Sequence, residues 1–321
     1  MKKKLISIVT PCYNEEENVE QIYLRVKGVM NNFYNYNYEH IFIDNCSKDR
    51  TVEILKKIAE KDKNVKIILN TRNFGHIRSP YYALLQSNGD AAVMIAADLQ
   101  EPPEAIERFI ELWERGYKIV VGVKNKSEEN AVLFLIRKVY YNLINKLSEI
   151  KLIKNFTGFG LYDKRVVDIL RELNDPYPYF RGLVCDIGFK VAKVCYIQKS
   201  RKRGITKNNF YTLYDIAMLG ITNHSKIPLR LATMFGFLFS IISFLTGIAY
   251  FIYKLIYWKS FELGIAPLVV GVFFFFSINL FFLGILGEYI GAIHTQILKR
   301  PLVIEKERIN FDKKYIKLKN Y

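Results

Sequence analysis

The first 120 residues alternate between short apolar runs and longer segments with helical spacing. Four runs rich in β-branched and apolar residues predict buried strands: "LISIVT" (5–10), "EHIFIDN" (39–45), "VKIILN" (65–70) and "AAVMIAADL" (91–99). Between them, apolar residues recur at helical intervals over 15–31, 51–61 and 79–86. Strands that alternate with helices in this way indicate βαβ units, and therefore an α/β domain built on a mostly parallel sheet.

Two much longer apolar runs follow this domain. Residues 231–253 and 263–287 contain no charged side chain. Each run exceeds the roughly 20 residues that a helix needs to cross the apolar core of a bilayer. The N-terminal lysines lead directly into the first strand, without the pattern of a signal peptide. We therefore expect a cytoplasmic N-terminal domain followed by a two-helix transmembrane hairpin.

Basic residues gather on both sides of the predicted hairpin. They are Lys199, Arg201, Lys202, Arg203, Lys207, Lys226 and Arg230 before it, and Lys299, Arg300, Lys306 and Arg308 after it. The connecting loop carries only Lys254 and Lys259, so the positive-inside rule places both ends in the cytoplasm and the protein in the plasma (inner) membrane. The formal charge of +16 is then explained by anionic lipid, and no nucleic-acid-binding signature accompanies it.

This pattern divides the chain into four parts. Residues 1–206 form the α/β domain, and 207–228 form an interfacial segment. The apolar residues of that segment, Phe210, Leu213, Tyr214, Ala217 and Ile221, have the spacing of an amphipathic helix in the membrane surface. Residues 229–290 hold the two membrane helices, and 291–321 form a cytoplasmic tail.

Polar residues follow each predicted strand: "PCYNEEE", "DNCSKD", "TRNFGH" and "ADLQEPP". The carboxyl ends of parallel strands meet at one edge, where α/β proteins bind ligands. Taken singly, Asp44 or Asp98 is also explained as a helix cap. The chain has neither a GxGxxG sequence after the first strand nor a P-loop, so a nucleotide would be bound by carboxylates, amides and a metal ion.

These same stretches, "SIVTPCYNEEEN", "IFIDNCSKDRT", "TRNFGH" and "ADLQEPPE", resemble family 2 glycosyltransferases with a GT-A fold. Together with the hairpin and "GEYIGAIHTQILKRPL", nearly the whole chain is similar to bacterial polyprenyl-phosphate (bactoprenol) glycosyltransferases. The resemblance implies a nucleotide-sugar pocket formed by Pro11, Tyr13, Glu15, Asp44, Arg72, Asn73, Gly75 and Asp98. It also implies Mg²⁺ or Mn²⁺ at Asp98 and Gln100, and Asp98 as a catalytic residue.

The chain departs from the family pattern at two positions. Ala96 stands where the first aspartate of an Asp-x-Asp metal motif is expected, which leaves one carboxylate and one amide for the ion. A hard divalent cation completed by substrate phosphates and water needs no more than one or two protein ligands. Gly158 stands where many relatives carry an acid that serves as a base. A phosphate acceptor needs no such base, because its second pKa is about 6 and it is already ionised.

The segment "YIQKSRKRGITKNNF" supplies cations for that acceptor. The resemblance places Arg201 and Lys207 near the active site and implies that both are catalytic residues. We also expect Arg201, Arg203 and Lys207 to bind the lipid phosphate. Non-specific attraction to anionic lipid is the alternative explanation for each of these residues.

The resulting hypothesis is the inverting transfer of one sugar from UDP-glucose, ahead of UDP-N-acetylglucosamine, to polyprenyl (undecaprenyl) phosphate at the cytoplasmic membrane face, for modification of cell-surface polysaccharide. A homo-oligomer and a separate flippase are expected partners. One alternative is a processive polysaccharide synthase, although "QKSRK" departs from the Gln-x-x-Arg-Trp signature and only two spans are predicted. The other is a non-catalytic membrane scaffold derived from a transferase.

Overall fold

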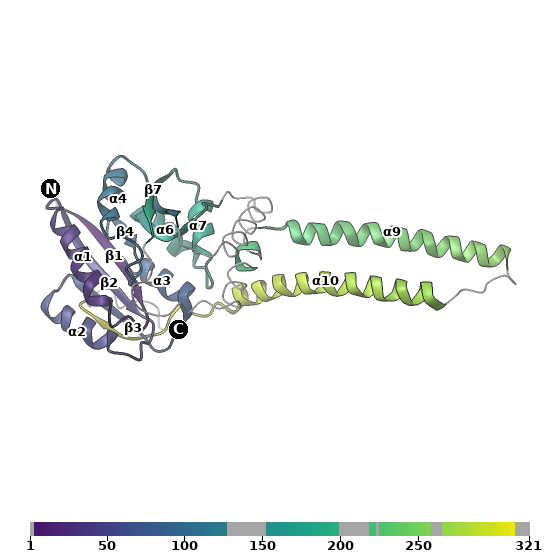
Figure 1. Ribbon diagram of the computed structural model, residues 1–321, viewed down its shortest axis with the longest axis horizontal. Helices are drawn as coiled ribbons and strands as arrows, with labels where there is room; N and C mark the ends of the chain where they lie inside the picture. Colours follow the sequence, from purple (N-terminus) through teal and green to yellow (C-terminus); the bar gives the residue numbers. More distant parts are fainter. Residues whose placement is uncertain (1–2, 127–151, 199–217, 223–224, 258–264, 312–321) are drawn as a thin grey trace.

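Eight strands form one mixed sheet in the order β7-β5-β6-β4-β1-β2-β3-β8 (Figure 1). This computed structural model describes residues 3–126, 152–198, 218–222, 225–257 and 265–311. The strands are β1 Lys4–Cys12, β2 Tyr36–Asp44, β3 Val65–Asn70, β4 Ala91–Met94, β5 Ile119–Lys126, β6 Phe156–Asp163, β7 Val191–Ile197 and β8 Glu305–Ile309. The helices are α1 Val19–Asn31, α2 Thr51–Lys61, α3 Gly75–Leu85, α4 Ala105–Glu114, α6 Lys164–Leu173, α7 Phe180–Asp186, α9 Ile227–Ile256 and α10 Ile265–Leu298.

The centre of the sheet is the predicted βαβ region. β1 pairs in parallel with β2 and β4, and β2 pairs in parallel with β3. The antiparallel pairs are formed by β6, with β4 and β5, and by β8, with β3. The α/β fold with a parallel core is therefore confirmed, and the antiparallel strands come from parts of the chain where no strand was predicted.

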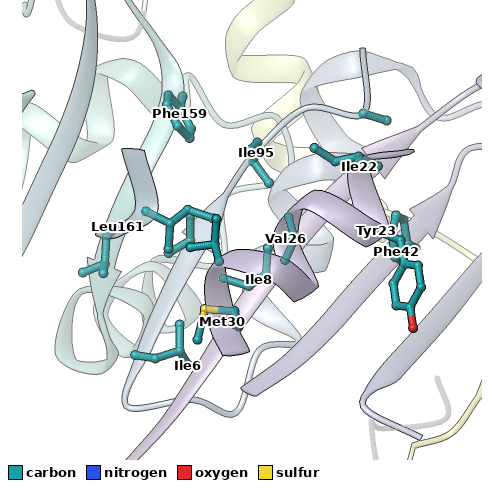
Figure 2. Packing of buried hydrophobic residues seen from close by; sticks show 14 of the residues in the cluster. Ile6, Ile8, Ile22, Tyr23, Val26, Met30, Phe42, Ile95, Phe159 and Leu161 are labelled. Carbon is teal, nitrogen blue, oxygen red and sulfur yellow. The ribbon is translucent and has the colours of Figure 1, made fainter. Parts of the chain in front are cut away.

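Helices cover both faces of this sheet because the strand residues alternate between two apolar cores. Ile6 and Ile8 of β1 face α1, where Ile22, Val26 and Met30 pack against them (Figure 2). Val9 of β1 lies in the second core, which contains residues of α3 and α6. Both cores are closed to solvent, so the sheet is a rigid platform for the loops at its edge.

Some element boundaries differ from the prediction for local reasons. α1 begins at Val19 rather than at residue 15, because the backbone N–H groups of Asn18 and Val19 both donate to the Glu15 carbonyl in a turn. α3 begins at Gly75 rather than at 79 and contains Pro80. β4 ends at Met94, which leaves 95–101 as a loop rather than a strand.

The two long apolar helices extend away from the sheet domain and run side by side (Figure 1). Aromatic rings join them, with centroids 6.3 Å apart for Phe235 and Phe282 and 6.2 Å apart for Phe239 and Phe275. Ile227–Thr246 and Phe274–Leu298 are apolar enough and long enough to cross a membrane, and neither stretch is buried by the protein. Exposed apolar helices of this length indicate membrane association.

The chain returns to the sheet after the second long helix. β8 lies antiparallel to β3 at the edge of the sheet, with Ile309 opposite Ile67. Arg308 of β8 donates to Gln86 (2.7 Å) and to Glu305 (2.6 Å), and Asn310 donates to the carbonyls of Ala59 and Val65. Of the predicted tail, 291–298 therefore continue α10, and Glu305–Ile309 form an integral strand of the domain.

Candidate active site

The carboxyl ends of β1, β2, β3 and β4 meet at one edge, as the sequence predicted. In the β1–β2 register, Cys12 stands opposite Asp44. Three residues in the loops at these ends have positive φ: Asn14 (53°), Cys46 (66°) and Leu99 (59°). A non-glycine residue in this conformation costs of order 1–3 kcal/mol, and such residues concentrate at functional sites. The strained backbone therefore lies at the predicted binding edge.

Asp44 closes the turn after β2. Its carboxylate accepts hydrogen bonds from the backbone N–H of Ser47 (2.9 Å) and from the Ser47 hydroxyl. The Ser47 hydroxyl in turn lies 2.8 Å from the backbone N–H of Asn14, which joins the β1 and β2 loops. Burial raises the pKa of Asp44, and the hydrogen bonds from Ser47 act against that rise. The alternative role as a cap of α2 is wrong, because Asp49 accepts the Thr51 N–H.

Three asparagine side chains build the floor after β3. The Asn45 carbonyl accepts from the Asn70 amide (3.0 Å) and from the Phe74 N–H (2.9 Å). The Asn45 amide donates to Asn73 (2.8 Å), whose carbonyl also accepts the Gly75 N–H (2.8 Å). Gly75 has a φ of +85°, which favours glycine. This network fixes the "TRNFGH" loop against the end of β2.

Arg72 lies at the exposed side of that loop. Its guanidinium stacks over the Phe74 ring at 4.0 Å and donates to the Asn73 carbonyl at 3.1 Å. The remaining donors of the guanidinium fork are suited to an anionic ligand such as a diphosphate.

Asp98 and Gln100 lie on one tight turn after β4. The Asp98 carboxylate accepts the Gln100 N–H at 3.2 Å, across Leu99 in its left-handed conformation. The helix-capping alternative for Asp98 is wrong, because α4 begins at Ala105, seven residues later. One carboxylate and one amide carbonyl on the same turn fit a hard divalent cation, which prefers oxygen ligands. Within the described residues there is no group of three or more His, Cys, Asp or Glu side chains suited to a metal ion, so substrate oxygens would complete the shell.

Glu101, to which the sequence analysis gave no role, is a buried carboxylate at this turn. Its two oxygens accept the Ala96 N–H (2.9 Å) and the Thr157 hydroxyl (2.9 Å). Burial raises the pKa of Glu101 to about 7, and the nearby Asp98 carboxylate contributes to the increase. The motif "ADLQEPP" contained this residue, but its burial depends on β6, which no sequence pattern placed beside the loop.

A cavity of about 300 Å³ opens beside Glu101. Of the predicted nucleotide residues, Pro11 lines it. The other lining residues include Ala96, Glu101, Thr157, Gly158, His76, Tyr179, Phe180 and Arg181. Arg181, on α7, is a cationic lining residue that the sequence analysis missed, because nothing in "YPYFRG" marks it. The Glu101 carboxylate and the Arg181 guanidinium at one small cavity can help to orient a sugar beside a phosphate group.

The backbone conformation at 158 disfavours any side chain, acidic or not. Gly158 has a φ of +110°, and an added Cβ would meet Phe180 and Met94 at 3.7–3.8 Å. Asp163, the nearest carboxylate along the chain, pairs with Ala91 at the start of β4, away from the catalytic edge. There it accepts the Trp113 indole N–H (2.7 Å) and the Lys118 ammonium (2.9 Å), so its role is structural.

The remaining predicted residues are only partly placed. Tyr13 and Glu15 follow β1 at the same edge, and the Glu15 N–H lies 2.8 Å from the Thr51 hydroxyl. Arg201, Arg203, Lys207 and most of the predicted amphipathic helix lie outside the described residues, so their roles stay predictions.

Comparison with known proteins identifies the family of the chain. Residues 7–169 match the family described as Glycosyl transferase family 2. The chain belongs to glycosyltransferase family 2. A glycosyltransferase of Bacillus subtilis (strain 168), YkcC, described as uncharacterized, is 36% identical over 96% of this chain and 95% of its own. The bactoprenol glucosyl transferase of Shigella phage SfX is 33% identical over 94% of this chain and 99% of its own.

The family assignment makes this protein a glycosyltransferase with a GT-A-type sheet. Its fold is also similar to the solved glucosyl-3-phosphoglycerate synthase of Mycobacterium tuberculosis, with a TM-score of 0.49 and 18% identity over 68% of this chain and 76% of that chain. The strand-end edge described above is then the candidate active site of a family 2 glycosyltransferase.

Proposed function

We propose that the protein transfers one sugar from a nucleotide donor, UDP-glucose first, to polyprenyl phosphate at the cytoplasmic face of the membrane. One observation carries this proposal. The turn that holds Asp98 and Gln100 belongs to a domain that is joined to two exposed apolar helices. The full-length similarity to a bactoprenol glucosyl transferase supports the lipid acceptor.

In this proposal the donor lies across the ends of β1 to β4. The asparagine-braced loop, with Arg72 at its exposed side, faces the diphosphate, and Asp98 and Gln100 hold Mg²⁺ or Mn²⁺. When bound, the ion offsets the negative charge of the departing nucleoside diphosphate. Arg181 and His76, which both line the cavity, orient the acceptor phosphate.

The bond changes need no protein base. An ionised oxygen of the carrier phosphate attacks the anomeric carbon, and the bond from that carbon to the diphosphate breaks with inversion of configuration. The nucleoside diphosphate leaves with the bonding electrons, so no proton is removed from the acceptor. This agrees with a glycine at 158, and catalysis consists of positioning and charge stabilisation.

The test is a transfer assay on purified full-length protein with undecaprenyl phosphate, Mg²⁺ or Mn²⁺ and a panel of UDP- and GDP-sugars. We expect a lipid-linked product from one donor, and at least about a hundredfold loss of rate in Asp98→Ala or with EDTA. Asp168→Asn, a half-exposed carboxylate on α6, is the matched control and should retain full activity. Nucleotide binding without product from any donor would favour the scaffold alternative, and polymeric product would favour a processive synthase.

A further inference from the structure

Glu101 is a buried carboxylate next to the proposed metal ligands. Its side chain lies at the cavity beside the Asp98 turn, and the residue is only 8% exposed. Within the described residues, its hydrogen-bond partners are the Ala96 N–H and the Thr157 hydroxyl, both of which are neutral. Lys124 favours the charged form of Glu101 through its own charge and not through one of these hydrogen bonds. A buried carboxylate of this kind is costly unless a cation pairs with it.

The geometry leaves room for such a cation. Each carboxylate oxygen of Glu101 accepts one hydrogen bond and keeps a second lone pair. The group is anchored at Ala96, on the same loop as Asp98 and directly after β4. Glu101 therefore brings a negative charge, in addition to that of Asp98, close to Ala96.

We propose that Glu101 is a positioning residue for the divalent cation, acting through its charge and through the shape that it gives the 96–101 loop. This inference rests on the proposed function, which places the ion at Asp98 and Gln100. Glu101 supplies the negative charge that a carboxylate at 96 would have supplied. Its hydrogen bond to the Ala96 N–H holds that end of the loop in place.

A purely structural role makes a different prediction. In that case Glu101 would connect β6 to the loop through Thr157. Loss of that one hydrogen bond would then weaken Mn²⁺ binding as much as loss of the Glu101 charge. Thr157→Val removes the hydroxyl and keeps the shape of the side chain. It therefore separates the fastening role from the charge.

The experiment measures Mn²⁺ affinity by electron paramagnetic resonance of free Mn²⁺, with full-length protein in detergent and UDP present. We expect Glu101→Gln to bind Mn²⁺ at least about tenfold more weakly, in the range seen when groups supporting a metal site are removed. Thr157→Val should stay within about threefold of the wild type. Ala96→Asp in the Glu101→Gln background should restore most of the lost affinity, and the unfolding temperature without metal should not fall in Glu101→Gln.

Three results would overturn the proposal: unchanged Mn²⁺ affinity in Glu101→Gln, an equal loss in Thr157→Val, or no rescue by Ala96→Asp. These results leave the proposed function intact, because the wild type still binds Mn²⁺ with UDP. A wild type that binds neither Mn²⁺ nor UDP would remove the proposed function and this inference together.

Discussion

Gly158 shows how a single backbone angle limits the chemistry of the site. Its φ of +110° lies where side chains are rarely tolerated, and its neighbours Phe180 and Met94 leave space only for ordinary contact. The absence of an acid at this position is therefore built into the path of β6.

Restoring an acid at this position should not help the enzyme. We expect Gly158→Asp to lower the free energy of unfolding by about 1–3 kcal/mol, because the new side chain must adopt a strained conformation. Transfer to a phosphate acceptor should fall rather than rise. Thermal unfolding and the transfer assay check both points, with Gly28→Asp on the open face of α1 as the control. Faster transfer in Gly158→Asp would contradict a mechanism without a base.

His40 gives a pH dependence that is independent of the active site. The ring is fully buried on β2, stacks on Phe42 at 4.0 Å and lies 2.9 Å from the Thr10 hydroxyl. Burial lowers the pKa of His40 from 6.5 to about 3. The unfolded chain therefore binds a proton below pH 6.5 that the folded protein does not bind.

Stability should accordingly fall as the pH decreases from 6.5 towards 3, by up to about 1.4 kcal/mol per pH unit from this residue. The measurement is the unfolding free energy in denaturant between pH 7 and pH 4.5. In His40→Gln this part of the slope should disappear, whatever the effect on absolute stability. If the unfolding free energy of His40→Gln changed with pH as steeply as that of the wild type, His40 would not be the source of this pH dependence.

At the scale of elements, the loop after β3 depends on the end of β2. Asn45→Ala should leave the Phe74 N–H without its acceptor and the Asn70 amide with only the Ser79 hydroxyl, at a cost of about 1–3 kcal/mol. We expect weaker UDP binding as well, since the loop that carries Arg72 and Asn73 loses its brace. Calorimetric titration with UDP measures this, and Asn37→Ala, exposed on the same strand, is the control. Unchanged UDP affinity would separate this loop from the donor site.

The sequence predicted this edge well because its elements are local. β3 and α2 have the predicted bounds, because the pattern of apolar residues within each segment is enough to identify it. β6 and β8 were not predicted, because their pairing partners are far away in the chain. Glu101, Thr157 and Arg181 were missed for the same reason, since their place at the cavity depends on strands and a helix that only the fold brings there.

At the scale of the whole molecule, β8 connects the membrane hairpin to the catalytic sheet. Arg308, which is 14% exposed, pairs with Glu305 and donates to Gln86. Arg308→Ala should lower the unfolding free energy by about 2 kcal/mol, because these charge-assisted hydrogen bonds are lost. Lys306→Ala, exposed on the same strand, should have little effect. Equal unfolding temperatures for the two variants would mean that β8 contributes little to the domain.

The return of β8 also means that the catalytic domain is tethered to the membrane twice. One connection runs from the domain to α9 and the other from α10 back to β3, where the Thr71 N–H donates to the Ile304 carbonyl at 3.0 Å. A domain joined to a membrane segment by one linker can rotate relative to the bilayer. Two connections restrict that rotation. In the proposed function, these two attachments would keep the active site close to the membrane surface, where a lipid-borne acceptor can reach it.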